Sequence, residues 1–129
     1  MGYDMNLYTT LFSEMWVQEF SKKGGGHHSA HIHFNQHVSG IYFLKCSDKT
    51  SNPIFHDPKT GARATKLTMK PKQVILAGTD LVHFKPTPGT LIIFPGYLEH
   101  EFSVDHGLEP FRFIHWNIQA IPKGMSKDV

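Results

Sequence analysis

Histidines are concentrated in one short stretch of this chain, and their spacing fits metal binding. Five of the ten histidines fall within residues 27–37, and His31 and His33 are two residues apart. On a β-strand, side chains at i and i+2 leave the same face. Neutral imidazole is a common protein ligand for iron, zinc, copper and nickel. The sequence therefore predicts that His31 and His33 hold one metal ion, with a third ligand from a distant segment. Residues 95–100, which end in His100, are the expected source.

The other histidines are interpreted as structural or solvent-exposed. Three lie beside Gly, Ser or Asn and are expected in polar loops: His27, His28 and His37. Four stand alone and are expected to be hydrogen-bonded structural residues: His56, His83, His106 and His115. His115 and Trp116 are also candidates to line the pocket.

The segments that must position these side chains have the pattern of short β-strands. Apolar, β-branched and aromatic runs alternate with Gly and Pro turns, which is typical of a sandwich or barrel. The expected strands are residues 15–21, a segment from 31 onward, 38–45, 54–55, 64–69, 74–77, 81–85, 91–94, 100–104 and 111–118. A short turn or helix is expected before residue 15. The fold class is all-β, and a jelly roll is the version in which distant strands share one interior.

Composition places the chain among ordinary globular proteins and excludes several function classes. Its 129 residues are 40% hydrophobic and 19% charged, which predicts one domain over residues 1–129. The net charge is +2 and no run of Lys or Arg exceeds two residues, so no nucleic-acid footprint is expected. No apolar run reaches membrane-spanning length. The single cysteine, Cys46, fits a reducing cytoplasm, and an exposed sheet edge predicts a homo-oligomer.

Several blocks of the chain resemble one enzyme family. The first consists of His31-x-His33, the run VSGIYFL at residues 38–44 and the run FHDP at 55–58. The second is PGTLIIFPGYLEH at residues 88–100, and the third is FRFIHWNI at residues 111–118. Together they resemble the iron(II)/2-oxoglutarate-dependent oxygenases over about residues 24–121. The size is similar to that of compact members encoded by phages.

The resemblance implies a fold, a reaction and cofactors. The family fold is a double-stranded β-helix, which agrees with the strand pattern above. The implied cofactors are Fe(II) and 2-oxoglutarate, with O₂ as the oxidant. The implied reaction hydroxylates a substrate that the sequence does not identify and releases succinate and CO₂. For a phage-encoded protein, the expected location is the host cytoplasm.

Individual roles also follow from the resemblance. His31 matches the first metal ligand and His100 the distal one. Arg112 is the expected partner of the far carboxylate of 2-oxoglutarate, since guanidinium meets a carboxylate through two parallel hydrogen bonds. Tyr42 could add a hydroxyl to the same carboxylate. Arg112 precedes Asn117 by five residues, whereas related sequences leave one more, and a slip of one residue reverses the face of a strand.

The third metal ligand is left open between two solutions. The wider superfamily has Asp or Glu two residues after the first histidine, where this chain has His33. Either three imidazoles bind the metal, or a carboxylate comes from elsewhere, with Asp57 first and Asp105 next.

Two alternative functions also remain open. One is a cupin-like three-histidine metalloprotein that does not use 2-oxoglutarate. The other is a non-catalytic β-sandwich that serves as a binding or assembly module.

Overall fold

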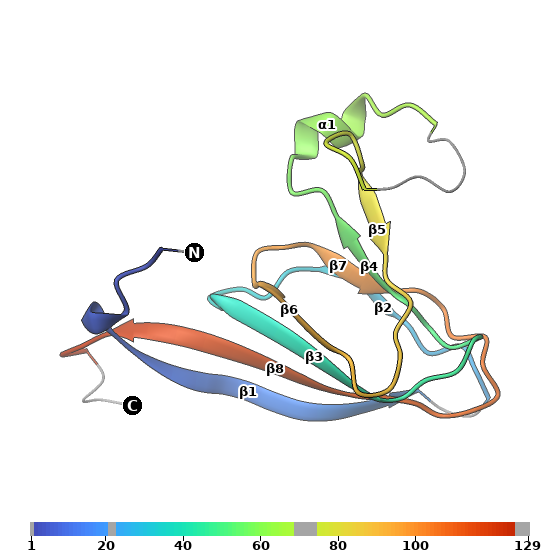
Figure 1. Cartoon of the computed structure of the whole chain (residues 1–129), viewed down its shortest axis with the longest axis horizontal. Helices are drawn as coiled ribbons and strands as arrows, with labels where there is room; N and C mark the ends of the chain where they lie inside the picture. The colour runs from blue at the N-terminus through green and yellow to red at the C-terminus, as the bar shows by residue number, and fades with distance from the viewer. Residues whose placement is uncertain (1, 21–22, 69–74, 126–129) are drawn as a thin grey trace.

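Two four-stranded antiparallel sheets face each other in the computed structural model, which describes residues 2–20, 23–68 and 75–125. Sheet A has the strand order β1-β8-β3-β6, and sheet B has the order β2-β7-β4-β5 (Figure 1). The elements in chain order are η1 (Met5–Leu7), β1 (Tyr8–Phe20), β2 (His28–His31), β3 (Val38–Lys45), β4 (Pro53–His56), α1 (Thr60–Ala64), β5 (Leu81–His83), β6 (Leu91–Pro95), β7 (His100–Phe102) and β8 (Phe111–Pro122). The expected double-stranded β-helix is confirmed.

Alternation of buried and partly exposed residues over the first part of β8, residues 111–118, separates an inner face from an outer face. Phe111, Phe113, His115 and Asn117 are buried, and the residues between them are partly exposed. The inner residues meet phenylalanines of other strands, for example Phe102, whose ring stacks on that of Phe113 with centroids 4.7 Å apart. Seven residues form the core between the sheets: Phe20, Ile41, Phe43, Phe94, Phe102, Phe111 and Phe113. Burial of these aromatic rings provides most of the interior apolar area.

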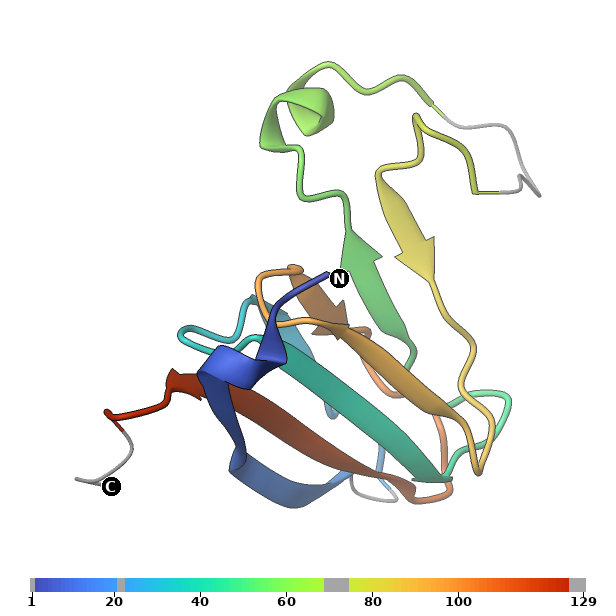
Figure 2. The same cartoon turned by 60° about the vertical axis from the view of Figure 1, so that its left-hand side comes forward.

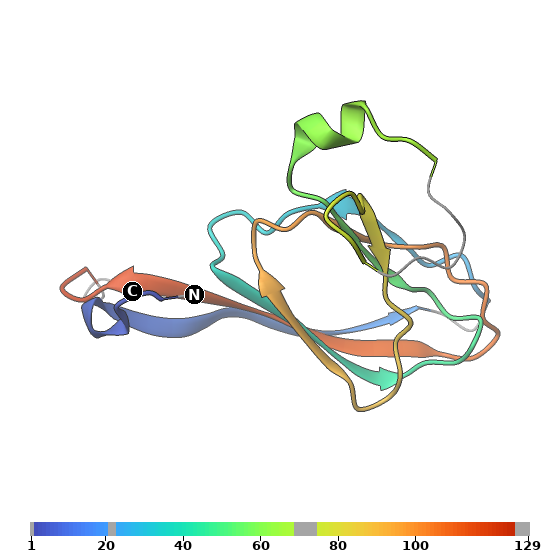
Figure 3. The ribbon, with the colours of Figure 1, turned by 45° about the horizontal axis from the view of Figure 1, so that its top comes forward.

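The amino-terminal segment is a long strand, which corrects the expected turn or helix before residue 15. Only η1 is helical there, and Asp4 caps it by accepting a hydrogen bond from the N–H of Asn6. Strand β1 then pairs with β8 from Tyr8 to Phe20, with a bulge near Ser13. The helical spacing of apolar residues is overridden because pairing along the whole of β8 satisfies the backbone of β1. This two-stranded arm extends beyond the rest of sheet A (Figure 3).

The segment between β4 and β5 differs from the expected strands. Residues 60–64 form the short helix α1, and residues 65–68 are irregular, so the strand predicted at 64–69 is wrong where it is described. Residues 75–77 are also irregular, and the rest of the strand predicted at 74–77 lies outside the described residues. Strands β4 and β5 form one side of sheet B, and helix α1 lies beyond their end, away from sheet A (Figure 2).

Among the described residues, no helix has the length and apolar character needed to cross a membrane.

Candidate metal centre

Three histidines from two segments that are distant in sequence come together between the sheets. His31 ends β2, His100 begins β7, and His33 follows β2 by two residues. One ring nitrogen from each of them lies within 4.8 Å of the others. The ring centroids of His31 and His100 are 4.5 Å apart, and those of His33 and His100 are 5.0 Å apart. The structure therefore assembles the three side chains that the sequence singles out.

The local structure differs from the expected pair of histidines on one strand. Strand β2 ends at His31, which pairs with His100 on β7. His33 lies outside the strand, where its N–H donates to the carbonyl of Gly96 (2.9 Å). A side chain at Gly96 would place Cβ only 2.3 Å from the carbonyl oxygen of Gln36, so a glycine is required for this close approach. The turn after β2, rather than the pleat of a strand, therefore brings the ring of His33 toward that of His100.

Backbone carbonyls select the tautomer of two of the three imidazoles. Nδ1 of His31 lies 2.6 Å from the carbonyl oxygen of Ser29, and Nδ1 of His100 lies 2.9 Å from that of Leu98. A carbonyl oxygen only accepts, so each Nδ1 carries the hydrogen. In a neutral imidazole the Nε2 lone pair is then free to bind a metal, and such outer hydrogen bonds are what orient metal-binding histidines.

Burial favours the neutral form of His33 and His100. His100 is 1% exposed, and its burial lowers the pKa from 6.5 to about 4, with further lowering by His31 and His33. Burial is also the main cause that lowers the pKa of His33, followed by the charge of His31, while Glu14 acts in the opposite direction. Neutral imidazole is the form that binds metals, so burial favours the ligand form of His33 and His100 at neutral pH.

The inner face of sheet A adds a polar group to this centre. Asn117 on β8 accepts a hydrogen bond from the hydroxyl of Ser39 (2.6 Å) and donates one to the carboxylate of Glu14 (2.8 Å). The same amide nitrogen of Asn117 lies 3.3 Å from Nδ1 of His33. The sequence reasoning did not identify these roles. The only related pattern is the i, i+2 spacing of Glu14 and Trp16, which places both side chains on one face of a strand. This pattern becomes informative once β1 is known to be a strand.

His115 lies against the same centre. Its ring centroid is 4.6 Å from that of His33 and 4.4 Å from that of Trp16, on which it stacks. His115 is 3% exposed, and neither of its ring nitrogens has a hydrogen-bond partner among the described residues. Burial, followed by the charge of His33, lowers its pKa to about 3. The expectation that His115 is hydrogen-bonded is therefore wrong among the described residues. His115 is a buried, neutral imidazole beside the three-histidine group, and its role in lining a pocket stays a prediction.

Arg112 and Tyr42 lie on the outer face of sheet A, which corrects their expected position beside the metal centre. Arg112 alternates with the inward residues of β8 and forms an exposed ion pair with Glu19 on β1. Tyr42 pairs with Ile114, another outward position. The physical reason is the register of β8: with Asn117 directed inward, a residue five positions earlier must point outward.

The alternative carboxylate ligands have other roles in the structure. Asp57 accepts a hydrogen bond from the N–H of Lys59 (2.9 Å), as a turn residue does. Asp105 is buried, where its backbone bonds to Gly25 and Gly26 and its side chain accepts from the N–H of Gly107. Within the described ranges, no carboxylate joins the three histidines as a candidate ligand. The arrangement therefore favours three imidazoles over two imidazoles and a carboxylate.

The remaining histidines are distributed around the sandwich. His28 is half-buried on β2 rather than in a loop, and its ring contacts those of Phe20 and Phe102. His37 accepts a hydrogen bond from the N–H of Ala120 (3.1 Å).

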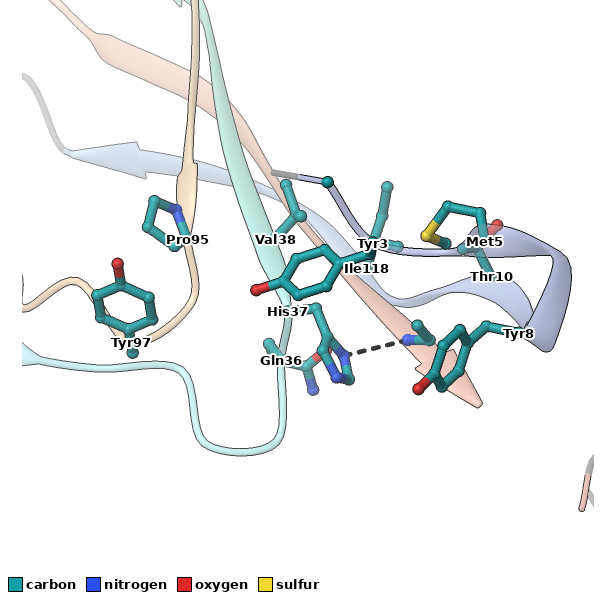
Figure 4. A pocket seen from close by; sticks show the side chains of 12 residues that line it. Tyr3, Met5, Tyr8, Thr10, Gln36, His37, Val38, Pro95, Tyr97 and Ile118 are labelled. Carbon is teal, nitrogen blue, oxygen red and sulfur yellow. Dashed lines mark hydrogen bonds between the residues drawn. The ribbon is translucent and has the colours of Figure 1, made fainter. Parts of the chain in front are cut away.

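A groove of about 540 Å³ lies beside His37 (Figure 4). It is lined by tyrosines and apolar residues of the arm and of the outer face of sheet A, and not by His31, His33 or His100. The groove is therefore separate from the metal centre.

Comparison with known proteins identifies the family. Residues 14–111 match the protein family described as "Putative 2OG-Fe(II) oxygenase". The chain belongs to this family. The match spans all three histidines of the centre and both strands that bring His31 and His100 together. No curated protein sequence matches the chain.

Solved structures share the fold of this family member at low sequence identity. An oxidoreductase of the 2OG-Fe(II) oxygenase family from Burkholderia pseudomallei aligns with a TM-score of 0.65 and 11% identity over 92% of this chain and 47% of that chain. SnoN, a non-haem α-ketoglutarate-dependent epimerase from nogalamycin biosynthesis, aligns with a TM-score of 0.61 and 11% identity, over 96% of this chain and 53% of that chain. The chain thus spans about half the length of both structures.

Proposed function

We propose that the chain is an iron(II)-dependent oxygenase whose metal ion is held by His31, His33 and His100. The observation that carries this proposal is the convergence of three ring nitrogens within 4.8 Å of one another, in a member of an Fe(II) oxygenase family. Three neutral imidazoles suit a divalent transition metal, and a set of three leaves coordination positions for other ligands. The donor chemistry of the site therefore fits the family metal.

The residues around the three histidines would hold and shield the ion. Bound iron would supply the oxidising chemistry that the protein itself lacks. The carbonyls of Ser29 and Leu98 fix the rings of His31 and His100. The buried ring of His115 covers the side of His33 that faces sheet A, and Trp16 stacks on that ring. The rings of Phe55 and Phe94 pack against His100. These contacts limit the motion of the three histidines and exclude water from the side of the centre that faces the core.

The cosubstrate is the finer part of the proposal. Membership of the family favours 2-oxoglutarate, with oxidation of a second substrate and formation of succinate and CO₂. In this version Arg112 and Tyr42 are not the anchor for the far carboxylate, because both lie on the outer face of sheet A.

A second candidate function is a three-histidine iron centre that works without 2-oxoglutarate. It is favoured by the inner face of β8, where the residues next to outward-pointing Arg112 are phenylalanines. Phe111 and Phe113 are fully buried in the aromatic core. The charges that act on the pKa values of His33, His100 and His115 come from neighbouring imidazoles and from Glu14. A dicarboxylate cosubstrate normally requires a cation, and these inward positions of β8 carry buried apolar side chains instead.

An anaerobic titration tests the proposal. The protein is titrated with Fe(II) and then with 2-oxoglutarate, while the visible charge-transfer band between iron and the oxo acid is recorded. His31→Ala removes one ligand, and His106→Ala is the matched control because His106 is exposed and outside the centre.

Iron binding that His31→Ala abolishes and His106→Ala retains is the expected result. A saturable band with 2-oxoglutarate then supports the oxygenase with the family cosubstrate. Iron binding without the band supports the second candidate. Equal iron binding by His31→Ala and wild type, or none by either, would overturn the proposed metal centre.

The other expectations stay predictions. The second substrate is unknown, and self-association is proposed because the edge strand β6 exposes Leu91 (49%) and Ile93 (59%) on its outer face. Such apolar positions on a strand with one unpaired edge favour the covering of that edge.

A further inference from the structure

His33 differs from the other two histidines in its second hydrogen bond. His31 and His100 each direct Nδ1 at a backbone carbonyl, but Nδ1 of His33 faces the side-chain amide nitrogen of Asn117 (3.3 Å). That nitrogen is a donor. As arranged, Nδ1 of His33 therefore accepts a hydrogen bond, and the proton of the neutral ring must be on Nε2.

The contact between His33 and His100 agrees with this tautomer. The two Nε2 atoms lie 3.2 Å apart. Nδ1 of His100 carries its hydrogen toward Leu98, so Nε2 of His100 is an acceptor and Nε2–H of His33 is the donor. In the metal-free protein the proton of His33 consequently occupies the position that a metal would take.

Metal binding through Nε2 requires His33 to change tautomer. The ring proton must then be on Nδ1, since neutral imidazole carries one proton. Nδ1–H of His33 and Nδ2–H of Asn117 would be two donors directed at each other. An acceptor between them would stabilise this arrangement: a fully buried unsatisfied donor costs about 1–3 kcal/mol, and the half-buried position of His33 carries part of that cost.

Glu14 is placed to supply that acceptor. Its carboxylate already accepts from Nδ2 of Asn117 (2.8 Å), the atom that faces His33. Glu14 and Asn117 are direct partners in the pairing of β1 with β8, so both side chains leave the same inner face. Asn117 is fixed from its other end by the hydroxyl of Ser39 (2.6 Å), which opposes rotation of the amide.

We propose that Glu14 is a positioning residue of the metal centre, accepting the Nδ1–H of His33 when the centre holds a metal. This inference rests on the proposed role of His33 as a ligand. The Glu14 carboxylate would place one negative charge near the metal, which a set of three imidazoles lacks. Its hydrogen bond would also make His33 a more basic metal ligand, as in other carboxylate–histidine–metal groups. The carboxylate that is absent from the ligand set is thereby supplied by a residue that contacts a ligand, His33, rather than the ion itself.

Metal affinity of two matched variants tests this role. Glu14→Gln keeps an oxygen that can accept from Asn117 but removes the charge. Glu19→Gln is the control, because Glu19 lies on the same strand but on the outer face, paired with Arg112. Affinities for Fe(II) and for Zn(II), each added alone under anaerobic conditions, are measured by competition with a coloured chelator. Loss of a carboxylate behind a metal-binding histidine lowers affinity by about 10–100-fold, and this is expected for Glu14→Gln only.

Nitrogen-15 NMR of the histidine rings reports the tautomer directly. In the metal-free wild type, the proton of His33 is expected on Nε2, and in the zinc-loaded protein on Nδ1. A purely structural role of Glu14 would lower the urea midpoint of the metal-free variant and leave metal affinity unchanged, and this would overturn the proposal. Equal metal affinity of Glu14→Gln and wild type, or equal weakening by both variants, would overturn it too.

The outcome is separable from that of the proposed function. If wild type binds no metal, or if His31→Ala binds as wild type does, the three-histidine centre itself is wrong. If the wild type binds metal and His31→Ala does not, the centre stands, and the Glu14→Gln comparison alone decides the role of Glu14.

Discussion

The Nε2 atoms of His33 and His100 lie 3.2 Å apart, which is hydrogen-bond distance between two groups that both act as metal ligands in the proposed centre. A bound ion would replace this hydrogen bond. It would link the turn after β2 to β7, two segments that are far apart in the sequence. Anything that binds only the folded state stabilises it, by about 2.7 kcal/mol when the free ligand is at 100 times its dissociation constant. We therefore expect Zn(II) at that excess to raise the free energy of unfolding by about 3 kcal/mol.

Urea unfolding with and without Zn(II) measures this effect, and a chelator should reverse it. His100→Ala should show no stabilisation by the metal, whereas His106→Ala should respond as wild type does. A zinc effect of equal size in His100→Ala would contradict the three-histidine assignment.

Acid should destabilise the fold through two buried imidazoles. Burial lowers the pKa of His100 to about 4 and that of His115 to about 3, from the ordinary histidine value of 6.5. Below pH 6.5 these two imidazoles therefore bind protons in the unfolded chain but stay neutral in the folded chain. The free energy of unfolding consequently falls as the pH falls from about 6.5 toward 4. The expected slope is at most about 1.4 kcal/mol per pH unit for each imidazole.

Urea unfolding of the metal-free protein at pH 7, 6 and 5 checks this slope. His115→Phe should lose the contribution of one imidazole and show a shallower dependence. Stability that is constant from pH 7 to pH 5 would contradict the lowered pKa values.

Arg112→Ala should leave metal and 2-oxoglutarate binding unchanged. Arg112 and Glu19 are 40% and 42% exposed in their ion pair on the outer face. Exposed ion pairs contribute about 0–1 kcal/mol, so the loss of stability should stay within that range. The charge-transfer titration of the variant provides the measurement. A large increase in the concentration of 2-oxoglutarate needed for half-saturation would show that Arg112 reaches the cosubstrate after all.

The sequence predicted the three-histidine group because its signals are local. The spacing of His31 and His33 and the second block ending in His100 are short patterns, and the all-β class follows from runs bounded by Gly and Pro. The face that Arg112 occupies is a different kind of property. It depends on register, which changes with a single residue, and one sequence does not fix the register of β8 against its neighbours.

The role of β1 was hidden for a related reason. Leu7, Leu11 and Met15 have helical spacing, and only the pairing of β1 with β8 overrides it. Without that strand, Glu14 and Asn117 are 103 positions apart with nothing to relate them. The proposed metal ligands were thus accessible from motifs, whereas the polar group behind His33 required the fold.

Gly40→Ala should destabilise the protein although Gly40 is in a regular strand. A Cβ at this position would lie 2.0 Å from Cζ2 of Trp116, whose indole covers the glycine on the outer face of sheet A. Trp116 would have to move, and Phe12 packs edge-on against it with ring centroids 5.8 Å apart. Overpacking of this kind costs about 1–3 kcal/mol.

The urea midpoint of Gly40→Ala provides the measurement, and Gly61→Ala is the matched control because a Cβ there meets nothing within 4 Å. Equal midpoints for the two variants would show that Trp116 moves aside freely.

His115→Phe should make the protein more stable. The imidazole of His115 is buried and neither ring nitrogen has a hydrogen-bond partner in the described part of the chain. The ring of His115 stacks on Trp16 with centroids 4.4 Å apart. A phenylalanine ring would keep this stacking and would remove the two unpaired nitrogen atoms from the buried position. An unsatisfied buried polar group costs about 1–3 kcal/mol, so a gain of about 1–2 kcal/mol is expected by urea unfolding at pH 7.

A buried group that lowers stability is expected at functional sites, and His115 lies against His33, a proposed ligand. His115→Phe should therefore bind Fe(II) about as tightly as wild type, because His115 is outside the three-histidine group. With an identified substrate, its turnover should be lower than that of wild type. A stable variant with undiminished turnover would show that the unpaired imidazole has no part in the chemistry, and a destabilised one would show that its nitrogens are satisfied in solution.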